Sequence, residues 1–155
     1  MPINNPLAEK EIKELIKVAK KTRKNAFAHR SMHKIGASVL TMDGKIFGGC
    51  NVESAISGLG TCAERCAADN AVSHGHYELR AVCTVDTQLV PICGACLQYI
   101  LLFSQVSDQD IWMVSADLKG NYEIKTLSQL LPEGYKTKKI ENLKIYSKKN
   151  KQIKK

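Results

Sequence analysis

Two short segments of this sequence carry residue types that could do chemistry, CAER at residues 62–65 and CGAC at residues 93–96. A single Cys-x-x-Cys pattern is compatible with a redox pair, with half of a zinc ribbon or with a chance spacing. No second Cys-x-x-Cys pattern is present in the sequence to complete a ribbon. The second segment is therefore best interpreted together with the first.

Cys62, Cys93 and Cys96 together offer three thiolates, and both segments stand where helices are expected to begin. The dipole of a helix favours the thiolate form at its N-terminus, and three thiolates are a suitable set of protein ligands for tetrahedral zinc. Three protein ligands leave a fourth position for water, as in catalytic zinc sites. Glu64 is close enough in sequence to exchange a proton with that water without binding the metal. The pattern therefore predicts a hydrolytic zinc site.

The pattern of apolar and turn residues predicts alternating helices and strands that would position these segments. The expected helices are residues 7–26, 62–74 and 94–103 with a short turn at 127–131, and the expected strands are 35–41, 46–52, 79–85, 111–115 and 122–126. Asn4, Asn5 and Pro6 can start the first helix, Thr61 can cap the second, and Gly75 can end it. This order favours an α/β fold in which helices cover a mixed sheet.

The composition bounds the class of protein. With 155 residues, 44% of them hydrophobic and 25% charged, the chain is expected to form one domain. No apolar run is long enough for a membrane helix, and the first residues do not resemble an export signal. Six cysteines without such a signal favour thiols or metal ligands over disulfides, so we expect a cytoplasmic protein without a membrane partner.

The positive charge is concentrated at the end of the chain. The chain has a formal net charge of +8. Residues 136–155 contain nine Lys and one acid, whereas residues 1–135 contain 14 basic and 14 acidic residues. We expect a folded domain over residues 1–135 and a basic, solvated or partly disordered extension over residues 136–155.

The combined motifs closely resemble the small homotetrameric cytidine deaminases. The matching segments are GCNVESA at 49–55, TCAERCA at 61–67, CGACLQ at 93–98 and LLP at 130–132. The resemblance runs in the right order from about residue 8 to residue 135. It implies the cytidine-deaminase fold, an α/β/α sandwich with a mixed five-stranded sheet, assembled as a homotetramer.

The resemblance also implies a reaction, the hydrolytic deamination of cytidine and deoxycytidine in pyrimidine salvage. Cys62, Cys93 and Cys96 would hold one Zn²⁺ per subunit, and Glu64 would be the catalytic proton shuttle. In such nucleobase deaminases, zinc-bound hydroxide attacks the ring carbon that carries the amine, and the glutamate protonates the adjacent ring nitrogen and then the leaving ammonia.

Four further residues take roles from the same resemblance. Asn51 and Glu53 would hydrogen-bond the ribose hydroxyls, which suits an amide that donates and accepts and a carboxylate that accepts. The backbone amide of Ala63 would hold the cytosine carbonyl at a helix N-terminus. Arg65 would hydrogen-bond the zinc thiolates and offset part of their negative charge.

The sequence departs from the family pattern at three positions that bear on the substrate. His33 stands where the family usually has a Phe that packs on the pyrimidine, and Leu97 stands where it usually has Arg. Tyr135 corresponds to the aromatic residue that reaches a neighbouring subunit's site, but here Glu133 and Gly134 precede it, as in the related blasticidin S deaminases. These departures leave open a deaminase of a modified cytidine or of a nucleoside like blasticidin S.

Two other functions remain open from the sequence. The Lys-rich extension could bind RNA through phosphate contacts, although one aromatic residue and no Arg make base recognition poor. The zinc site could also be purely structural, in which case removing the carboxylate of Glu64 would leave function unchanged.

Overall fold

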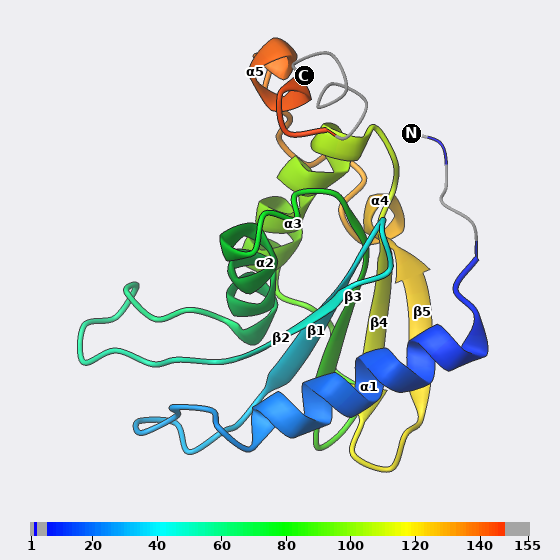
Figure 1. The fold of residues 1–155 in the computed structure, drawn as a ribbon. Coiled ribbons are helices and arrows are strands. Elements are labelled where there is room, and N and C mark those ends of the chain that lie inside the picture. The colour runs from blue at the N-terminus through cyan, green and yellow to red at the C-terminus, as the bar shows by residue number, and fades with distance from the viewer. Residues whose placement is uncertain (1, 3–5, 148–155) are drawn as a thin grey trace.

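A computed structural model describes residue 2 and residues 6–147 and shows a sheet with helices on both faces (Figure 1). In chain order its elements are α1 (Glu9–Arg23), β1 (Gly36–Thr41), β2 (Ile46–Cys50), α2 (Ala63–Ser73), β3 (Leu79–Asp86), α3 (Gly94–Ser107), β4 (Trp112–Asp117), β5 (Tyr122–Thr126), α4 (Leu127–Leu130) and α5 (Ile140–Lys144). No helix in the described part of the chain is long and apolar enough to cross a membrane.

The five strands form one mixed sheet in the order β2-β1-β3-β4-β5. β1 is antiparallel to both β2 and β3, β3 is parallel to β4, and β4 is antiparallel to β5. The parallel pair needs a crossover connection, and α3 provides it. The predicted five-stranded mixed sheet is confirmed.

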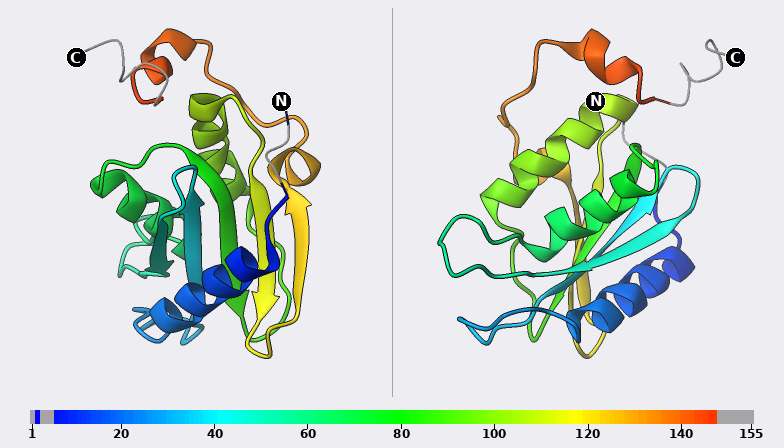
Figure 2. Two further views of the ribbon diagram at one scale, coloured as in Figure 1. Left: turned by 45° about the vertical axis from the view of Figure 1, so that its right-hand side comes forward. Right: turned by 60° about the vertical axis from the view of Figure 1, so that its left-hand side comes forward.

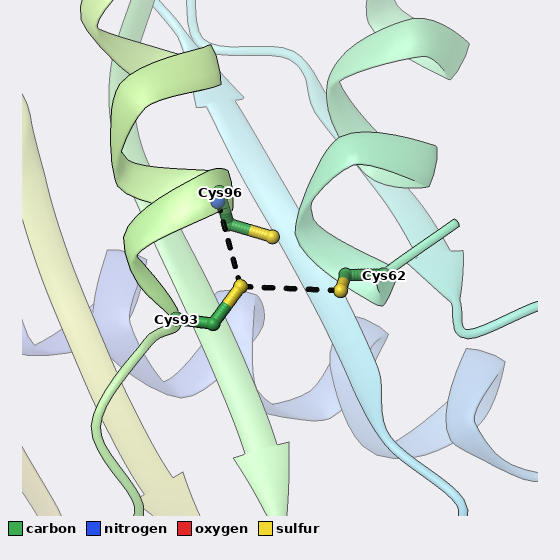
Figure 3. A group of neighbouring side chains, drawn as sticks. All are labelled: Cys62, Cys93 and Cys96. Carbon is green, nitrogen blue, oxygen red and sulfur yellow. Dashed lines mark hydrogen bonds between the residues drawn. The ribbon is translucent and has the colours of Figure 1, made fainter. Parts of the chain in front are cut away.

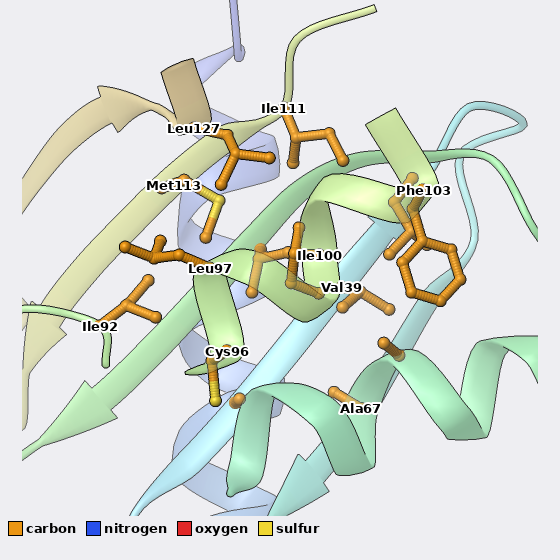
Figure 4. Packing of buried hydrophobic residues seen from close by; sticks show 14 of the residues in the cluster. Val39, Ala67, Ile92, Cys96, Leu97, Ile100, Phe103, Ile111, Met113 and Leu127 are labelled. Carbon is orange, nitrogen blue, oxygen red and sulfur yellow. The ribbon is translucent and has the colours of Figure 1, made fainter. Parts of the chain in front are cut away.

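Two apolar layers hold the helices to the sheet. α1 buries Ile12, Leu15, Ile16 and Ala19, which recur at helical spacing and face one side of the sheet. α2 and α3 pack on the opposite side, where Ile100 lies among inward-facing residues of β1, β3 and β4 (Figures 2 and 4). The fold is therefore the α/β/α sandwich that the sequence predicts.

The helix starts differ from the prediction in one informative way. The residue that caps α2 is Cys62, not Thr61, and α3 likewise begins with Cys93 at its N-cap. The Cys93 sulfur accepts a hydrogen bond from the backbone N–H of Cys96 at 3.4 Å. The predicted start of α3 directly after Cys93 is therefore confirmed, whereas the N-cap of α2 is one residue later than predicted and makes no side-chain cap hydrogen bond. α1 is capped at Ala8, and Asn4 and Asn5 lie outside the described residues.

The structure differs from the prediction in the length of α3 and in the packing of the C-terminal extension. α3 continues four residues past Phe103, because no helix-breaking residue precedes Asp108, which ends the helix in a left-handed conformation. The start of the basic extension packs on the domain, where α5 lies beside α3 and Tyr146 contacts Tyr77 with ring centroids 5.0 Å apart. Residues 148–155 lie outside the described part, so the predicted boundary at residue 135 stays a prediction.

Gly49 lets α2 lie directly against β2. A Cβ atom at this position would be 2.3 Å from the backbone nitrogen of Ala67 and 2.7 Å from the carbonyl oxygen of Ala63. Neither backbone atom can rotate away, so a side chain here would push the start of α2 off the sheet.

We expect Gly49→Ala to lower the free energy of unfolding by about 1–3 kcal/mol, the usual cost of overpacking. Denaturant unfolding of the purified variant would measure the change. Gly94→Ala is the matched control, because a Cβ there meets no atom within 4 Å. Equal stability of the two variants would contradict this role of Gly49.

Candidate metal centre

The two helix starts bring the three predicted ligands together. Cys62 lies at the start of α2 and Cys93 and Cys96 at the start of α3, and their side chains converge in the space between the helices (Figure 3). The sulfurs of Cys62 and Cys93 are 4.0 Å apart. All three sulfurs lie within 4.8 Å of one another, and among the described residues this is the only such group of potential metal ligands.

The geometry of the three sulfurs fits a zinc ion. With Zn–S bonds of about 2.3 Å, the sulfurs of a regular tetrahedron are about 3.8 Å apart. The separations in this group require only a small contraction to reach that value. Three thiolates also favour zinc over hard cations such as Mg²⁺ and leave its fourth position available.

Glu64 is fixed beside the sulfurs by a neighbour on β3. The residue is only 5% exposed. One carboxylate oxygen accepts a hydrogen bond from the Thr84 hydroxyl at 2.9 Å, and the other lies 3.5 Å from the Cys96 sulfur. The bond from Thr84 leaves the second oxygen turned toward the ligand group, where a carboxylate can exchange protons with a bound molecule.

The electrostatics of the site favour a thiolate on Cys62. A hydrogen bond from Cys96, helped by Arg65, lowers the pKa of Cys62 to about 6. The same hydrogen bond raises the pKa of Cys96, because Cys96 is its donor. Burial and the negative charge of Glu64 raise the pKa of Cys96 further. Burial alone would lower the pKa of Arg65, but its interactions with Cys62 and Cys96 raise it above its ordinary value.

Metal-free protein should therefore react with iodoacetamide first at Cys62. Because its pKa is lowered to about 6, its thiolate form predominates at neutral pH, whereas an ordinary cysteine has a pKa of about 8.5. Cys83 is the internal control, because burial raises its pKa to about 12. Peptide mass spectrometry across pH 5–9 would give the labelling profile of each cysteine. Labelling of Cys62 that begins only above pH 8 would contradict the prediction.

A cavity of about 300 Å³ opens beside the sulfurs, which is at the lower end of the usual range for small-molecule sites. Its lining includes the predicted site residues Asn51, Glu53, Cys62, Ala63, Glu64 and Cys93. Ala63 is the first residue of α2, so its backbone N–H has no acceptor within the helix. The structure thus brings most of the predicted site residues around one cavity.

Asn51 and Glu53 line this cavity but also hold a neighbouring segment. The Asn51 side chain accepts from the backbone N–H of Ile35 and donates to the carbonyl oxygen of His33, both at 2.9 Å. The Glu53 carboxylate accepts from the backbone N–H groups of Arg30 and Ser31 at 2.7 and 3.1 Å and from the Ser31 hydroxyl. The bond from the Ser31 hydroxyl is the main cause of a lowered pKa for Glu53.

His33, Tyr135 and Arg65 do not line the cavity. The ring of His33 instead pairs with Asp86 at 2.8 Å. Tyr135 is 78% exposed, and Gln98 holds its backbone through two hydrogen bonds of 2.7 and 2.9 Å. Arg65 donates to the carbonyl oxygen of Gly60 at 3.3 Å, and its buried Nε has no hydrogen-bond partner within the described residues.

Residues 9–109 match the model of the family described as "Cytidine and deoxycytidylate deaminase zinc-binding region". The chain belongs to this deaminase family. It is also 35% identical over 127 residues to a cytidine deaminase of Sporosarcina psychrophila, covering 81% of this chain and 91% of the relative. A cytidine deaminase of Halalkalibacterium halodurans is 37% identical over 78% of this chain and 91% of its own length.

Solved structures support the same assignment for this deaminase. A crystal structure of cytidine deaminase from Burkholderia pseudomallei superposes with a TM-score of 0.74 at 32% identity, covering 83% of this chain and all of the other. Because the matched family region binds zinc and three cysteines lie close enough to hold an ion, zinc is the cofactor of this deaminase.

Three residues that orient the site were not predicted from the sequence: Thr84, Asp86 and Gln98. Thr84 and Asp86 bind Glu64 and His33, and Gln98 holds the chain at Tyr135. The alternation of side chains along β3 could have indicated two of them. Thr84 and Asp86 point to the same face of the sheet as the buried Val82, at the end of an otherwise apolar strand. Polar side chains at such positions need buried partners.

Proposed function

We propose that this chain catalyses the zinc-dependent hydrolytic deamination of cytidine and deoxycytidine to uridine and deoxyuridine, releasing ammonia, as a step of pyrimidine salvage. The observation that carries the proposal is the placement of a buried carboxylate, Glu64, between the three cysteines and a cavity that fits a small molecule. The cytidine deaminases with which the chain shares 35–37% identity support the choice of substrate.

Glu64 is the group that moves protons in this proposal. Zinc held by Cys62, Cys93 and Cys96 would supply a Lewis acid that makes a water molecule acidic near neutral pH. The Glu64 oxygen that faces the cysteines accepts one proton of the attacking water and passes it to the ring nitrogen next to the reacting carbon. It then takes the second proton from the hydroxyl now on that carbon and gives it to the amine, so that ammonia leaves as the C–N bond breaks and the carbonyl forms. The Thr84 hydroxyl holds the other oxygen, so the carboxylate stays aimed at the reacting atoms.

The cavity walls orient the nucleoside. The backbone N–H of Ala63 donates to the cytosine carbonyl, and Asn51 and Glu53 bind the ribose hydroxyls. An amide has two N–H groups and two lone pairs, so Asn51 keeps one of each after its bonds to residues 33 and 35. Arg65 offsets the negative charge of the thiolates, which the raised pKa of its guanidinium supports.

We further propose a homotetramer in which Tyr135 of one subunit reaches the site of another. The exposure of the Tyr135 side chain, while its backbone is held by Gln98, supports this role. Residues 1–135 would form the deaminase domain and residues 136–155 its basic extension. The thiol-rich composition supports a cytoplasmic location.

A substrate panel tests the choice of nucleoside. Purified, zinc-loaded protein would be mixed with cytidine, deoxycytidine, cytidines modified on the exocyclic amine, and blasticidin S, and ammonia release would be measured. We expect cytidine and deoxycytidine to be turned over with the highest kcat/KM. Failure to release ammonia from both would overturn the proposal.

A deaminase of a modified nucleoside is the second candidate, and the His33–Asp86 pair favours it, because a polar ring replaces the apolar one usual in the family. Leu97 does not add to this case, since it is only 6% exposed and packs in the core. A modified cytidine that clearly exceeds cytidine in the same panel would select this candidate.

Nucleic-acid binding through the Lys-rich extension is the least supported function. The start of the extension is bound to the domain itself, because the Thr137 backbone and the Gln105 side chain form two hydrogen bonds of 3.1 Å. Removal of residues 136–155 should leave RNA affinity unchanged, as measured by filter binding at several salt concentrations.

A further inference from the structure

His33 and Asp86 form a pair that the proposed chemistry does not use. The Nε2 atom of His33 lies 2.8 Å from one carboxylate oxygen of Asp86. The Asp86 side chain is only 3% exposed, whereas that of His33 is 52% exposed. The second carboxylate oxygen accepts from the backbone N–H of Thr87 at 2.6 Å. A buried carboxylate is costly without hydrogen-bond partners, so this one fixes the imidazole ring.

The pair lies just outside the cavity. Thr84 and Asp86 are two residues apart on β3 and therefore face the same side of the sheet, toward α2 and α3. Thr84 lines the cavity and holds Glu64. Ile35 also lines the cavity and lies close to Thr84, because the adjacent Gly36 pairs with Val85 across β1 and β3. His33 and Asp86 each stand two residues further along their segments. Because Ile35 and Thr84 line the cavity, the pair lies at its rim.

Residues 30–35 form the rim segment. Besides the bond between His33 and Asp86, this segment is held by hydrogen bonds to Asn51 and Glu53, the two residues proposed to bind ribose. Glu53 accepts three hydrogen bonds from residues 30 and 31, and Asn51 bonds the backbone of residues 33 and 35. The rim segment therefore bridges the end of β2 and the end of β3. The orientations of Asn51 and Glu53 depend on where this segment lies.

Met32, in the middle of the rim segment, has a strained backbone. Its φ of 57° is left-handed, a conformation that side chains other than Gly adopt rarely. Its side chain is exposed, so packing of the thioether does not hold the backbone in this state. Such strain persists only where surrounding contacts fix it. The Met32 N–H donates to the carbonyl oxygen of Ala28 at 2.9 Å, which fixes one side locally. The bonds of Glu53 and Asn51 and the ring of His33 fix the segment on either side of Met32.

We propose that His33 and Asp86 are positioning residues that fix the rim segment and, through it, orient Asn51 and Glu53 toward the ribose of the substrate. This inference rests on the proposed function for the identity of the ligand. The pair would then contribute to recognition of the sugar and not to proton transfer. Its loss should weaken binding of nucleosides and leave binding of the free base unchanged.

Two variants of His33 separate the hydrogen bond from the mere presence of a polar side chain. The amide nitrogen of Gln is as many bonds from Cα as Nε2 of His, so His33→Gln can still donate to Asp86. The amide nitrogen of Asn corresponds to Nδ1, so His33→Asn cannot reach. Because the His33 side chain is half exposed, both variants should fold, and their thermal midpoints would verify this.

The first readout is the affinity of zinc-loaded protein for uridine and for uracil by calorimetry, with cytidine kinetics alongside. We expect His33→Asn to weaken uridine binding about tenfold, as for loss of one hydrogen bond to a charged group, with a similar rise in KM and kcat changed less than twofold. His33→Gln should stay within twofold of the parent. Equal weakening for uridine and uracil, or equal behaviour of the two variants, would overturn the inference.

The second readout does not depend on activity. The backbone N–H groups of Arg30, Ser31 and Ile35 should exchange with deuterium faster in His33→Asn than in the parent, because they are the donors to Glu53 and Asn51. Unchanged exchange in His33→Asn would overturn the positioning role, whatever the substrate. If the parent protein neither binds uridine nor deaminates cytidine, the proposed function is wrong. Faster exchange in His33→Asn would in that case still show that His33 fixes the rim segment.

Discussion

Glu64→Gln should lower kcat for cytidine by about 10²–10⁴-fold, the contribution typical of a positioned acid-base group. The amide has nearly the same shape as the carboxylate, and its oxygen can still accept the hydrogen bond from Thr84. It cannot take and return a proton, so the effect should fall on kcat and leave KM and bound zinc close to the parent values. Steady-state kinetics with metal analysis of the same preparation would measure all three.

The matched control is Glu14→Gln, which removes a half-exposed carboxylate of α1 that pairs with Lys17 and lies outside the cavity lining. That variant should keep full activity. If Glu64→Gln also kept full activity with zinc bound, the zinc would be structural and Glu64 would have no part in the chemistry.

Cys93→Ala should remove zinc and activity together. The side chain is one of three sulfurs within 4.8 Å of one another, and two thiolates cannot hold the ion with comparable affinity. Loss of groups that only support metal ligands already costs about 10–100-fold, so loss of a ligand should lower activity by more than about 100-fold. Zinc content by elemental analysis and the rate of cytidine turnover would be compared at equal protein concentration.

Cys66→Ala is the control for this variant. Cys66 lies on α2 close in sequence to Cys62 but outside the group of three sulfurs. It should retain one zinc per chain and normal turnover. A Cys93→Ala protein that kept zinc and activity would show that the metal is held elsewhere.

Most of the fold could be predicted because its signals are local. The buried residues of α1 recur at helical spacing, the Asp43-Gly44 turn marks the first hairpin, and Gly75 ends α2 with the expected positive φ of 81°. The helix α5 was not predicted, because its stability comes from contacts of the extension with α3 and Tyr77, which lie far away in sequence.

The metal ligands could be predicted for a similar reason, since their chemistry is visible in residue type and spacing. The residues that orient the site could not. Thr84, Asp86 and Gln98 act through partners 20, 53 and 37 residues away, and their side-chain types are ordinary for strands and helices. The sequence placed His33 near the pyrimidine by resemblance, but only the structure shows a buried carboxylate beside its ring.

The most direct test is to add zinc stepwise to metal-free protein and to follow the conversion of cytidine at each step. Uridine and ammonia should form in equal amounts, at a rate that rises with bound zinc and stops rising at one ion per chain. Protein that binds one zinc per chain through its cysteines and produces no uridine would contradict the assignment of this site as a cytidine deaminase centre.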